Sequence, residues 1–307
     1  MDDIATMVAD PRLWAGLNRP DLPPTEADVV MFGVPWDGNA SFRKGAREAP
    51  RVLRSITYTA PPTTEDFDSL AGMRIRDLGD LDMSDPGRIE GAVAGLVSAG
   101  VFFIMVGGDH SVTIPALRGV DRAIDGSLGI VHVDAHFDLC DAMDVNRWSH
   151  GCVERRSLEL ASVRGAGAIT FVGVRSAETE ELDFIASNPV RVYSAKDVDR
   201  LGAARVAGET VAAMAGFDAV YLTVDIDCLD PAYAGGTGTP QFGGLTARQL
   251  LDLLEGLFRL NVIGMDVVEV APSLDDSLAS VFAARKIVTE CWGHVRRARG
   301  GNLRGRG

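Results

Sequence analysis

Long hydrophobic runs are absent from this chain of 307 residues. Because a membrane helix needs about 20 apolar residues, we expect no membrane span. Basic residues are few, with 30 Lys and Arg against 43 Asp and Glu and a net charge of −13. This argues against a nucleic-acid partner, which would require a basic surface. Only four cysteines occur, too few for a disulfide framework, and they predict reduced thiols in a cytoplasmic protein. The first residues, Met1-Asp2-Asp3-Ile4, lack the layout of a signal peptide.

No linker, internal repeat or low-complexity block divides the chain. Hydrophobic residues make up 46% of it, which is enough for one large core, and we predict a single domain over residues 1–307. The segment 296–307 is basic and rich in glycine, and we predict a disordered or solvated end there. A weak contact of this tail with nucleic acid is the alternative prediction.

Apolar segments typical of strands alternate with segments of helical length. Strands are expected at 29–34, 101–106, 129–133, 168–174, 190–193, 219–224 and 262–267. Helices are expected at 86–99, 112–123, 153–161, 178–187, 204–215, 247–258 and 277–297. Continuous apolar strands separated by helices indicate a parallel sheet that is covered on both faces. The sequence therefore predicts a three-layer α/β/α fold around a central, mostly parallel sheet, with ligands bound beyond the carboxyl ends of the strands.

Two short runs place acids and a histidine at every second position, each after a predicted strand. They are Asp134-Ala135-His136-Phe137-Asp138 and Asp225-Ile226-Asp227. Since alternate side chains of a strand share a face, each run directs its polar groups the same way. His110 follows a third strand, in Gly107-Gly108-Asp109-His110-Ser111. Buried together, these carboxylates would repel one another, and bound cations remove that cost.

We therefore predict a site for two divalent metal ions. Its six candidate ligands are His110, Asp134, His136, Asp138, Asp225 and Asp227. The four aspartates carry a charge of −4, which two divalent ions balance. Oxygen and nitrogen ligands without sulfur suit Mn²⁺, with Ni²⁺, Co²⁺, Fe²⁺ or Zn²⁺ as alternatives. On a straight strand Asp134 and Asp138 would lie roughly 13 Å apart, whereas paired catalytic metals lie about 3.5–4 Å apart. The chain must therefore curl back after Asp134.

These motifs resemble those of the ureohydrolase family, which comprises arginases, agmatinases and related amidinohydrolases. The resemblance spans roughly residues 28–290 and rests on the segments 107–111, 134–138, 150–151, 225–231, 236–240, 243–246 and 268–272, with 42–46 similar to the N-terminal loop of the family. The segment 265–272 looks closer to agmatinases than to arginases. The resemblance implies an arginase-like fold, a binuclear manganese site and hydrolysis of a guanidino group to urea and an amine. It also implies a homo-oligomer, a trimer or a hexamer.

The resemblance also implies how the ligands divide between the metals. One ion is bound or bridged by His110, Asp134, Asp138 and either Asp225 or Asp227. The other is bound by His136 together with Asp134 and the same pair. The division of Asp225 and Asp227 stays open at this point.

Three residues are the candidates for catalysis. Asp138 can orient the attacking water. His150 is expected to protonate the leaving amine, since an unperturbed histidine titrates near 6.5; its alternative is a loop histidine without a role. Glu269 is expected to bind the guanidinium with both oxygens, or else to pair with an arginine of the protein.

The remaining polar residues are expected to have supporting functions. His132 is predicted to be a hydrogen-bonded core residue, Asp109 to support a ligand, and Asp230 to shape a turn. The loop 139–149 is predicted to form the pocket rim. There, acids suit a cationic substrate tail and Arg147 suits a carboxylate; the polar and aromatic rim residues are Asp141, Asp144, Asn146, Arg147 and Trp148.

The sequence thus predicts a metal-dependent enzyme of agmatinase type that acts on a small guanidino substrate. Guanidinobutyrase, guanidinase and formiminoglutamase activities are the neighbouring alternatives. A non-catalytic subunit that supports an active partner is a hypothesis of another class, although all six ligand positions are filled. A third hypothesis is a metallohydrolase that cleaves another bond, such as an amide.

Overall fold

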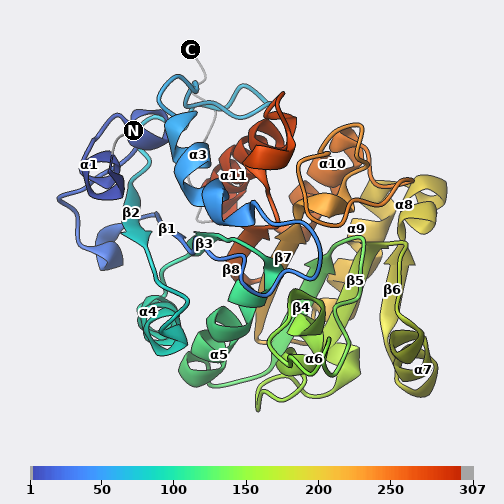
Figure 1. Cartoon of the computed structure of the whole chain (residues 1–307). Coiled ribbons are helices and arrows are strands. Elements are labelled where there is room, and N and C mark those ends of the chain that lie inside the picture. Colours follow the sequence, from blue (N-terminus) through green and yellow to red (C-terminus); the bar gives the residue numbers. More distant parts are fainter. Residues whose placement is uncertain (1–2, 299–307) are drawn as a thin grey trace.

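The computed structural model describes residues 3–298, whose strands form one parallel sheet of eight (Figure 1). The strand order is β2-β1-β3-β8-β7-β4-β5-β6, and every neighbouring pair is parallel. The strands are β1 (Val29–Gly33), β2 (Ile75–Asp80), β3 (Phe103–Val106), β4 (Leu128–Val133), β5 (Ile169–Val174), β6 (Arg191–Ser194), β7 (Ala219–Asp225) and β8 (Val262–Val268).

Helices cover both faces of this sheet, as Figure 1 shows. They are α1 (Ile4–Val8), α2 (Leu13–Gly16), α3 (Ala49–Ser55), α4 (Pro86–Ser98), α5 (Thr113–Ala123), α6 (Val153–Ser157), α7 (Thr179–Ser187), α8 (Ala195–Leu201), α9 (Ala203–Met214), α10 (Ala247–Leu257) and α11 (Ala279–Ala298). Apolar residues of α3 and of α8 to α11 form one core with the sheet. Those of α4, α5 and α7 belong to a second core on the other face.

Alternation along the strands separates the two cores. In β1, Val29 and Met31 belong to the first core and Val30 and Phe32 to the second. All four side chains are fully buried, because side chains of a strand alternate between faces and both faces are covered. The predicted α/β/α fold with a parallel sheet is therefore confirmed.

Most predicted elements are found within a few residues of their expected bounds, and the exceptions have physical causes. The strand β2 was not predicted, because it alternates buried and half-buried residues and includes Arg76 and Asp77. The short helices α1, α2, α3 and α8 were also missed. The disordered or solvated end predicted from residue 296 is wrong for residues 296–298, which belong to α11. Residues 299–307, the rest of that tail, lie outside the described residues.

The topology brings four carboxyl strand ends together. The strands β3, β8, β7 and β4 are consecutive neighbours at the centre of the sheet. Asp225 is the last residue of β7, and the segments that follow β3, β8 and β4 carry His110, Glu269 and Asp134. In the part of the chain that the structure describes, no helix is long and apolar enough to cross a membrane.

Candidate metal centre

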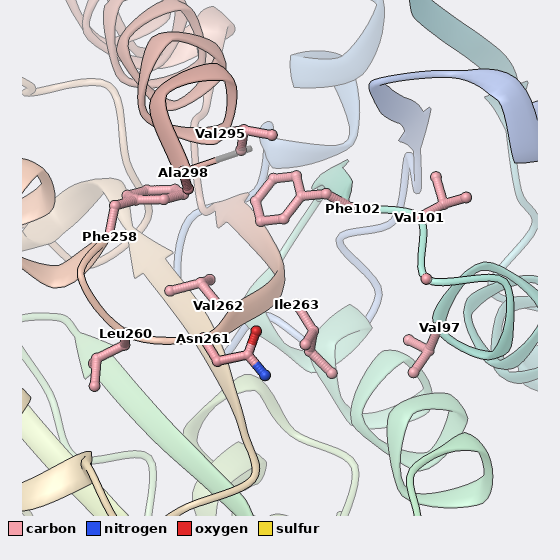
Figure 2. Close-up of a pocket in the computed structure, with 11 residues that line it drawn as sticks. Val97, Val101, Phe102, Phe258, Leu260, Asn261, Val262, Ile263, Val295 and Ala298 are labelled. Carbon is pink, nitrogen blue, oxygen red and sulfur yellow. The ribbon is translucent and has the colours of Figure 1, made fainter. Parts of the chain in front are cut away.

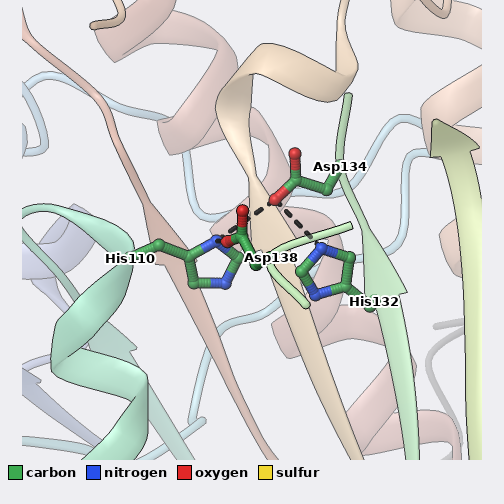
Figure 3. Close-up of side chains that lie close together, drawn as sticks. All are labelled: His110, His132, Asp134 and Asp138. Carbon is green, nitrogen blue, oxygen red and sulfur yellow. Dashed lines mark ion pairs between the residues drawn. The ribbon is translucent and has the colours of Figure 1, made fainter. Parts of the chain in front are cut away.

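The first group of ligands surrounds the imidazole of His110. Its Nδ1 lies 3.1 Å from Asp134 Oδ2, 3.0 Å from Asp138 Oδ2 and 3.5 Å from Asp225 Oδ2. Figure 3 shows the His110, Asp134 and Asp138 side chains directed at one another. Both His110 Nδ1 and Asp134 Oδ2 are buried without a hydrogen-bond partner among the described residues. Buried polar atoms are almost always satisfied, so their unpaired state indicates a place for a cation.

The second group surrounds His136, on the other oxygen of Asp134. His136 Nδ1 lies 3.4 Å from Asp134 Oδ1 and 3.2 Å from Asp227 Oδ2. Asp134 therefore faces one histidine with each oxygen. The geometry also separates the pair left open by the sequence, because Asp225 approaches His110 and Asp227 approaches His136.

Backbone geometry confirms that the chain curls back after β4. The strand ends at Val133, and Asp134 Oδ1 accepts a hydrogen bond of 2.6 Å from the His136 N–H. Asp138 has a φ of +53°, a left-handed conformation that few residues other than glycine adopt. This turn returns Asp138 to the side of His110, as the metal prediction required.

Close packing also fixes the loop that carries His110. A Cβ atom at Gly108 would lie 1.6 Å from the carbonyl oxygen of Trp36, so only glycine can pass there. Asp109 accepts hydrogen bonds from the N–H groups of Asn39 and Ser111. It therefore ties the loop that carries His110 to an N-terminal segment. Any support that it gives His110 acts through the backbone of this loop.

Charge makes the centre a strong cation site. Burial and the nearby carboxylates of Asp227 and Asp134 raise the pKa of Asp225 well above its usual range. Burial lowers the pKa of His110, but the carboxylates around it raise that pKa well above 6.5. Both shifts have one origin, since negative charge is concentrated where water is excluded. A cation at the centre relieves this repulsion.

His132 is confirmed as a buried, hydrogen-bonded core residue. Its Nδ1 lies 2.9 Å from Glu154 Oε1, and its Nε2 lies 3.1 Å from Asp134 Oδ2. Its ring stacks on that of His110 with centroids 5.2 Å apart (Figure 3). Burial opposes protonation of His132, but Asp134 and Glu154 raise its pKa to about 10. A protonated His132 thus adds a positive charge behind Asp134.

His150 and Glu269 form a pair beside the metal ligands. His150 Nδ1 lies 2.8 Å from Glu269 Oε1, and the same oxygen accepts a hydrogen bond from the His110 N–H. Burial lowers the pKa of His150, but Glu269 raises it to about 9. The Ser41 N–H donates to His150 Nε2 at 3.1 Å, so the proton of the neutral ring is on Nδ1. The alternative of an arginine partner for Glu269 is not found among the described residues.

The Glu269 geometry differs from the expected bidentate contact with the guanidinium. Oε1 is already engaged by His110 and His150, while Oε2 has no recorded hydrogen bond within residues 3–298. Glu269 also has a φ of +60°, an uncommon conformation that points to a functional constraint. One oxygen, Oε2, remains for a substrate.

A cavity of about 190 Å³ opens beside the two histidine groups. Its walls include ligands and catalytic candidates together with residues from the start of α7. The lining residues are Ser41, His136, Asp138, Cys140, Met143, His150, Gly151, Ser176, Ala177, Glu178, Glu181, Asp225, Thr239 and Gln241. No arginine or lysine lines it, and Glu178 and Glu181 add two acidic side chains to its wall.

The loop 139–149 contributes Cys140 and Met143 to the cavity wall, as predicted, but its polar and aromatic side chains are engaged elsewhere. Asp141 Oδ1 pairs with Arg156 at 2.5 Å and Arg147 at 3.3 Å, and Arg147 also pairs with Glu159 at 2.7 Å. Trp148 lies under the guanidinium of Arg118. None of Asp141, Asp144, Asn146, Arg147 and Trp148 lines the cavity. The sequence had offered acids for a cationic substrate tail and Arg147 for a carboxylate tail. Because Asp141 and Arg147 pair with each other, neither is free to select the substrate.

A second cavity, of about 360 Å³, lies at the opposite end of the sheet beside the start of β3 and β8 (Figure 2). Its lining consists of Val97, Gly100, Val101, Phe102, Phe258, Leu260, Asn261, Val262, Ile263, Val295 and Ala298. None of these residues has an ionisable side chain, so this cavity lacks the groups for hydrolysis.

Known proteins are similar to this chain in sequence and in overall structure. A family model described as "Arginase family" matches residues 27–293. The chain belongs to the arginase family. Proclavaminate amidinohydrolase of Streptomyces clavuligerus is 35% identical over 280 residues, covering 88% of each chain. Agmatinase of Neisseria meningitidis serogroup A is 35% identical and covers 87% of this chain and 86% of the relative. Agmatine ureohydrolase of Thermoplasma volcanium has a similar structure, with a TM-score of 0.81, 30% identity and coverage of 92% and 95%.

Membership establishes the general activity. The family model, the amidinohydrolase and agmatinase relatives and the His/Asp cluster together support a metal-dependent hydrolase of guanidino compounds, in the agmatinase-like branch. The chain is therefore an enzyme of the ureohydrolase type.

Sequence reasoning missed several residues that support the centre. Arg175 donates to the carbonyl oxygens of Asp227 at 2.7 Å and Gln241 at 2.7 Å, which fixes the loop after β7. Glu154 and Asp266 are buried carboxylates behind the ligands. The sequence could have indicated Asp266, because it is a lone acid inside the apolar strand β8. Ser41 gave no signal, since its contact with His150 joins residues far apart in the chain.

Proposed function

We propose that this protein uses two divalent metal ions to hydrolyse a small guanidino compound to urea and an amine. Mn²⁺ is the metal that we assign, with Ni²⁺ as the alternative. The observation that carries the proposal is the geometry of Asp134. Its two oxygens face His110 Nδ1 and His136 Nδ1 at 3.1 and 3.4 Å. A carboxylate in this position is suited to bridge two ions.

The residues present fit this pair of ions. We assign one ion to His110, Asp134, Asp138 and Asp225, and the other to His136, Asp134 and Asp227. The donors are carboxylate oxygens and imidazole nitrogens without sulfur, which suits Mn²⁺ and Ni²⁺. Asp225 and Asp227 each use their Oδ1 for a backbone N–H, of Asp227 and Ala135 respectively. The Oδ2 atoms remain directed at the histidines.

When bound, such ions lower the pKa of water that they hold from about 15.7 toward 7, which supplies a nucleophile at neutral pH. Asp138 lines the cavity and can orient that nucleophile by accepting its proton in a hydrogen bond. Glu269 Oε2 can accept a hydrogen bond from the guanidinium and hold its plane for attack. His150, kept protonated by Glu269, delivers a proton to the leaving amine.

The cavity favours a substrate whose distal end is neutral or cationic, such as agmatine. The lining contains Glu178 and Glu181 but no basic residue, so a carboxylate tail would lack a partner. Glu181 is committed to the N–H groups of Leu139 and Glu178. The exposed Glu178 is therefore the acid that we assign to the substrate amine.

A panel of guanidino compounds tests this function. We expect urea release from agmatine to exceed that from guanidinobutyrate, guanidine and formiminoglutamate when the protein is loaded with Mn²⁺ or Ni²⁺. Chelated protein should release no urea, and re-addition of either metal should restore turnover. Urea release at the native rate from thoroughly metal-stripped protein would contradict the metal requirement. Two metal equivalents without urea release from any of the compounds would instead support the non-catalytic alternative.

Replacing Glu269 with Gln should raise KM strongly and lower kcat, while both metals stay bound. The amide keeps the size of the side chain but loses the charge that attracts the guanidinium. It also removes the carboxylate that raises the pKa of His150. Protonated His150 then loses its proton at lower pH, so the alkaline limb of the kcat profile should move downward from about pH 9. Steady-state kinetics across pH, with metal analysis, measure both effects; native kcat/KM with an unmoved limb would make Glu269 structural.

We further propose a homo-oligomer, a trimer or a hexamer, in the cytoplasm. Several large apolar side chains are exposed on the described surface, including Phe67 at 92% and Phe242 at 84%, and exposed apolar residues are candidates for subunit contacts. All four cysteines are free and buried, which suits a reducing compartment. Sedimentation analysis determines the assembly.

A further inference from the structure

A buried acid lies behind the metal centre, inside the sheet. Asp266 of β8 is fully buried. Its Oδ1 accepts a hydrogen bond of 2.6 Å from the Thr223 hydroxyl of the neighbouring strand β7. Its Oδ2 accepts hydrogen bonds of 2.8 Å from the hydroxyls of Thr113 and Tyr221. The Asp266 carboxylate thus accepts three hydrogen bonds, and each of the three hydroxyl groups donates its only proton to Asp266.

The hydrogen bonds of Asp266 constrain His110, because Thr223 contacts both residues. His110 Nε2 lies 2.7 Å from Thr223 Oγ1. A threonine hydroxyl has one proton, and that of Thr223 is donated to Asp266. Thr223 Oγ1 can therefore only accept from His110, which requires the proton of the ring to be on Nε2. In the neutral ring that a metal ion requires, the lone pair of Nδ1 then faces Asp134, Asp138 and Asp225, where an ion would be bound.

The other histidine ligand lacks such support. His136 Nδ1 faces Asp134 and Asp227, but no hydrogen bond is recorded for its Nε2 anywhere in residues 3–298. Its side chain is 23% exposed, against 1% for His110. The two halves of the centre therefore differ in how firmly their histidine is held.

We infer that Thr223, held in turn by Asp266, is a positioning residue that fixes the tautomer and orientation of His110 and so sets the affinity of one of the two ions. This inference rests on the proposed binuclear centre. Partners of this kind behind a metal-bound histidine typically contribute 10–100-fold in metal affinity. No contact of Thr223 with the substrate is involved, so its effect should be on metal binding and not on chemistry at saturating metal.

Stepwise titration of metal-free protein with Mn²⁺ tests the inference in three variants. Thr223→Val keeps the shape but removes the acceptor, and we expect the Kd of one ion to rise about 10–100-fold. Thr223→Ser restores the hydroxyl and should restore the affinity. Thr170→Val is the matched control. Thr170 is also a buried strand threonine, but its hydroxyl has no recorded partner among the described residues. Its replacement should leave both affinities unchanged.

Turnover gives a second readout. The kcat of Thr223→Val should return to near the wild-type value at saturating Mn²⁺, because only the metal affinity is altered. If Thr223→Val does not fold by circular dichroism, Thr223→Ala takes its place. Unchanged Mn²⁺ affinity in the folded variant would overturn the inference, as would equal losses in Thr223→Val and Thr223→Ser. Failure of the proposed function is distinguishable, since wild-type protein would then bind no metal pair or release no urea.

Discussion

Asp134→Ala is expected to abolish urea release and to remove both metal ions. Among residues 3–298, only Asp134 faces a different histidine with each of its oxygens, at 3.1 Å from His110 Nδ1 and 3.4 Å from His136 Nδ1. Without Asp134, the charges of the metal ions and of the remaining carboxylates no longer balance in a site that excludes water. Metal analysis after dialysis, together with a urea assay, measures the effect.

Two further substitutions sharpen this prediction. Asp227→Ala should abolish activity but remove one ion, because Asp227 faces only the His136 side. Asp252→Ala makes the same change on the exposed surface of α10 and should leave metal content and turnover unchanged. Retention of both ions by Asp134→Ala would refute the bridging assignment. Loss of both ions from Asp227→Ala would show that the two halves bind metal as one unit.

His150→Asn is expected to lower kcat by roughly 10²–10⁴-fold, the usual contribution of general acid–base catalysis, with both metals retained. His150 lines the cavity and pairs with Glu269 at 2.8 Å, but it does not belong to either group of ligands. Asparagine can keep part of the hydrogen bonding but cannot deliver a proton near neutral pH. Single-turnover rates with saturating substrate, alongside metal analysis, separate this chemical step from binding.

A second histidine provides the control for this substitution. His294 lies in α11 beside Phe258, with ring centroids 5.1 Å apart, and no described contact joins it to the metal centre. His294→Asn should leave kcat unchanged at a temperature where the protein remains folded. A native rate in His150→Asn, or loss of its metals, would show that His150 is not the proton donor.

The residue types and their order along the chain were enough to predict the centre. Each ligand follows a strand with a nearly continuous apolar pattern, and parallel strands of a covered sheet place their carboxyl ends at one edge. His110, Asp134 and Asp225 therefore had to approach one another once the sheet was recognised. The need to curl after Asp134 followed from the spacing of two carboxylates on a straight strand.

Contacts between distant segments could not be predicted in the same way. Asp141 and Arg147 seemed available for a substrate, but the fold pairs Asp141 with Arg156 and Arg147 with Glu159. Apart from the candidate ligands Asp138 and Asp225, the acids that line the cavity come from the start of α7, more than 25 residues after His150. Sequence patterns report the face on which a side chain lies, whereas its partner depends on how loops pack.

The sequence by itself indicated the α/β fold and six candidate metal ligands, because strand periodicity and ligand chemistry are local properties. The class of reaction came from the resemblance of its motifs to those of the ureohydrolase family. Only the tertiary structure divided Asp225 and Asp227 between the two histidines, engaged Glu269 Oε1 with His110 and His150, and joined Asp266 to His110 through Thr223. These are contacts between neighbouring strands and loops that are far apart in the chain. Their geometry is set by sheet order and side-chain packing, which no local pattern encodes.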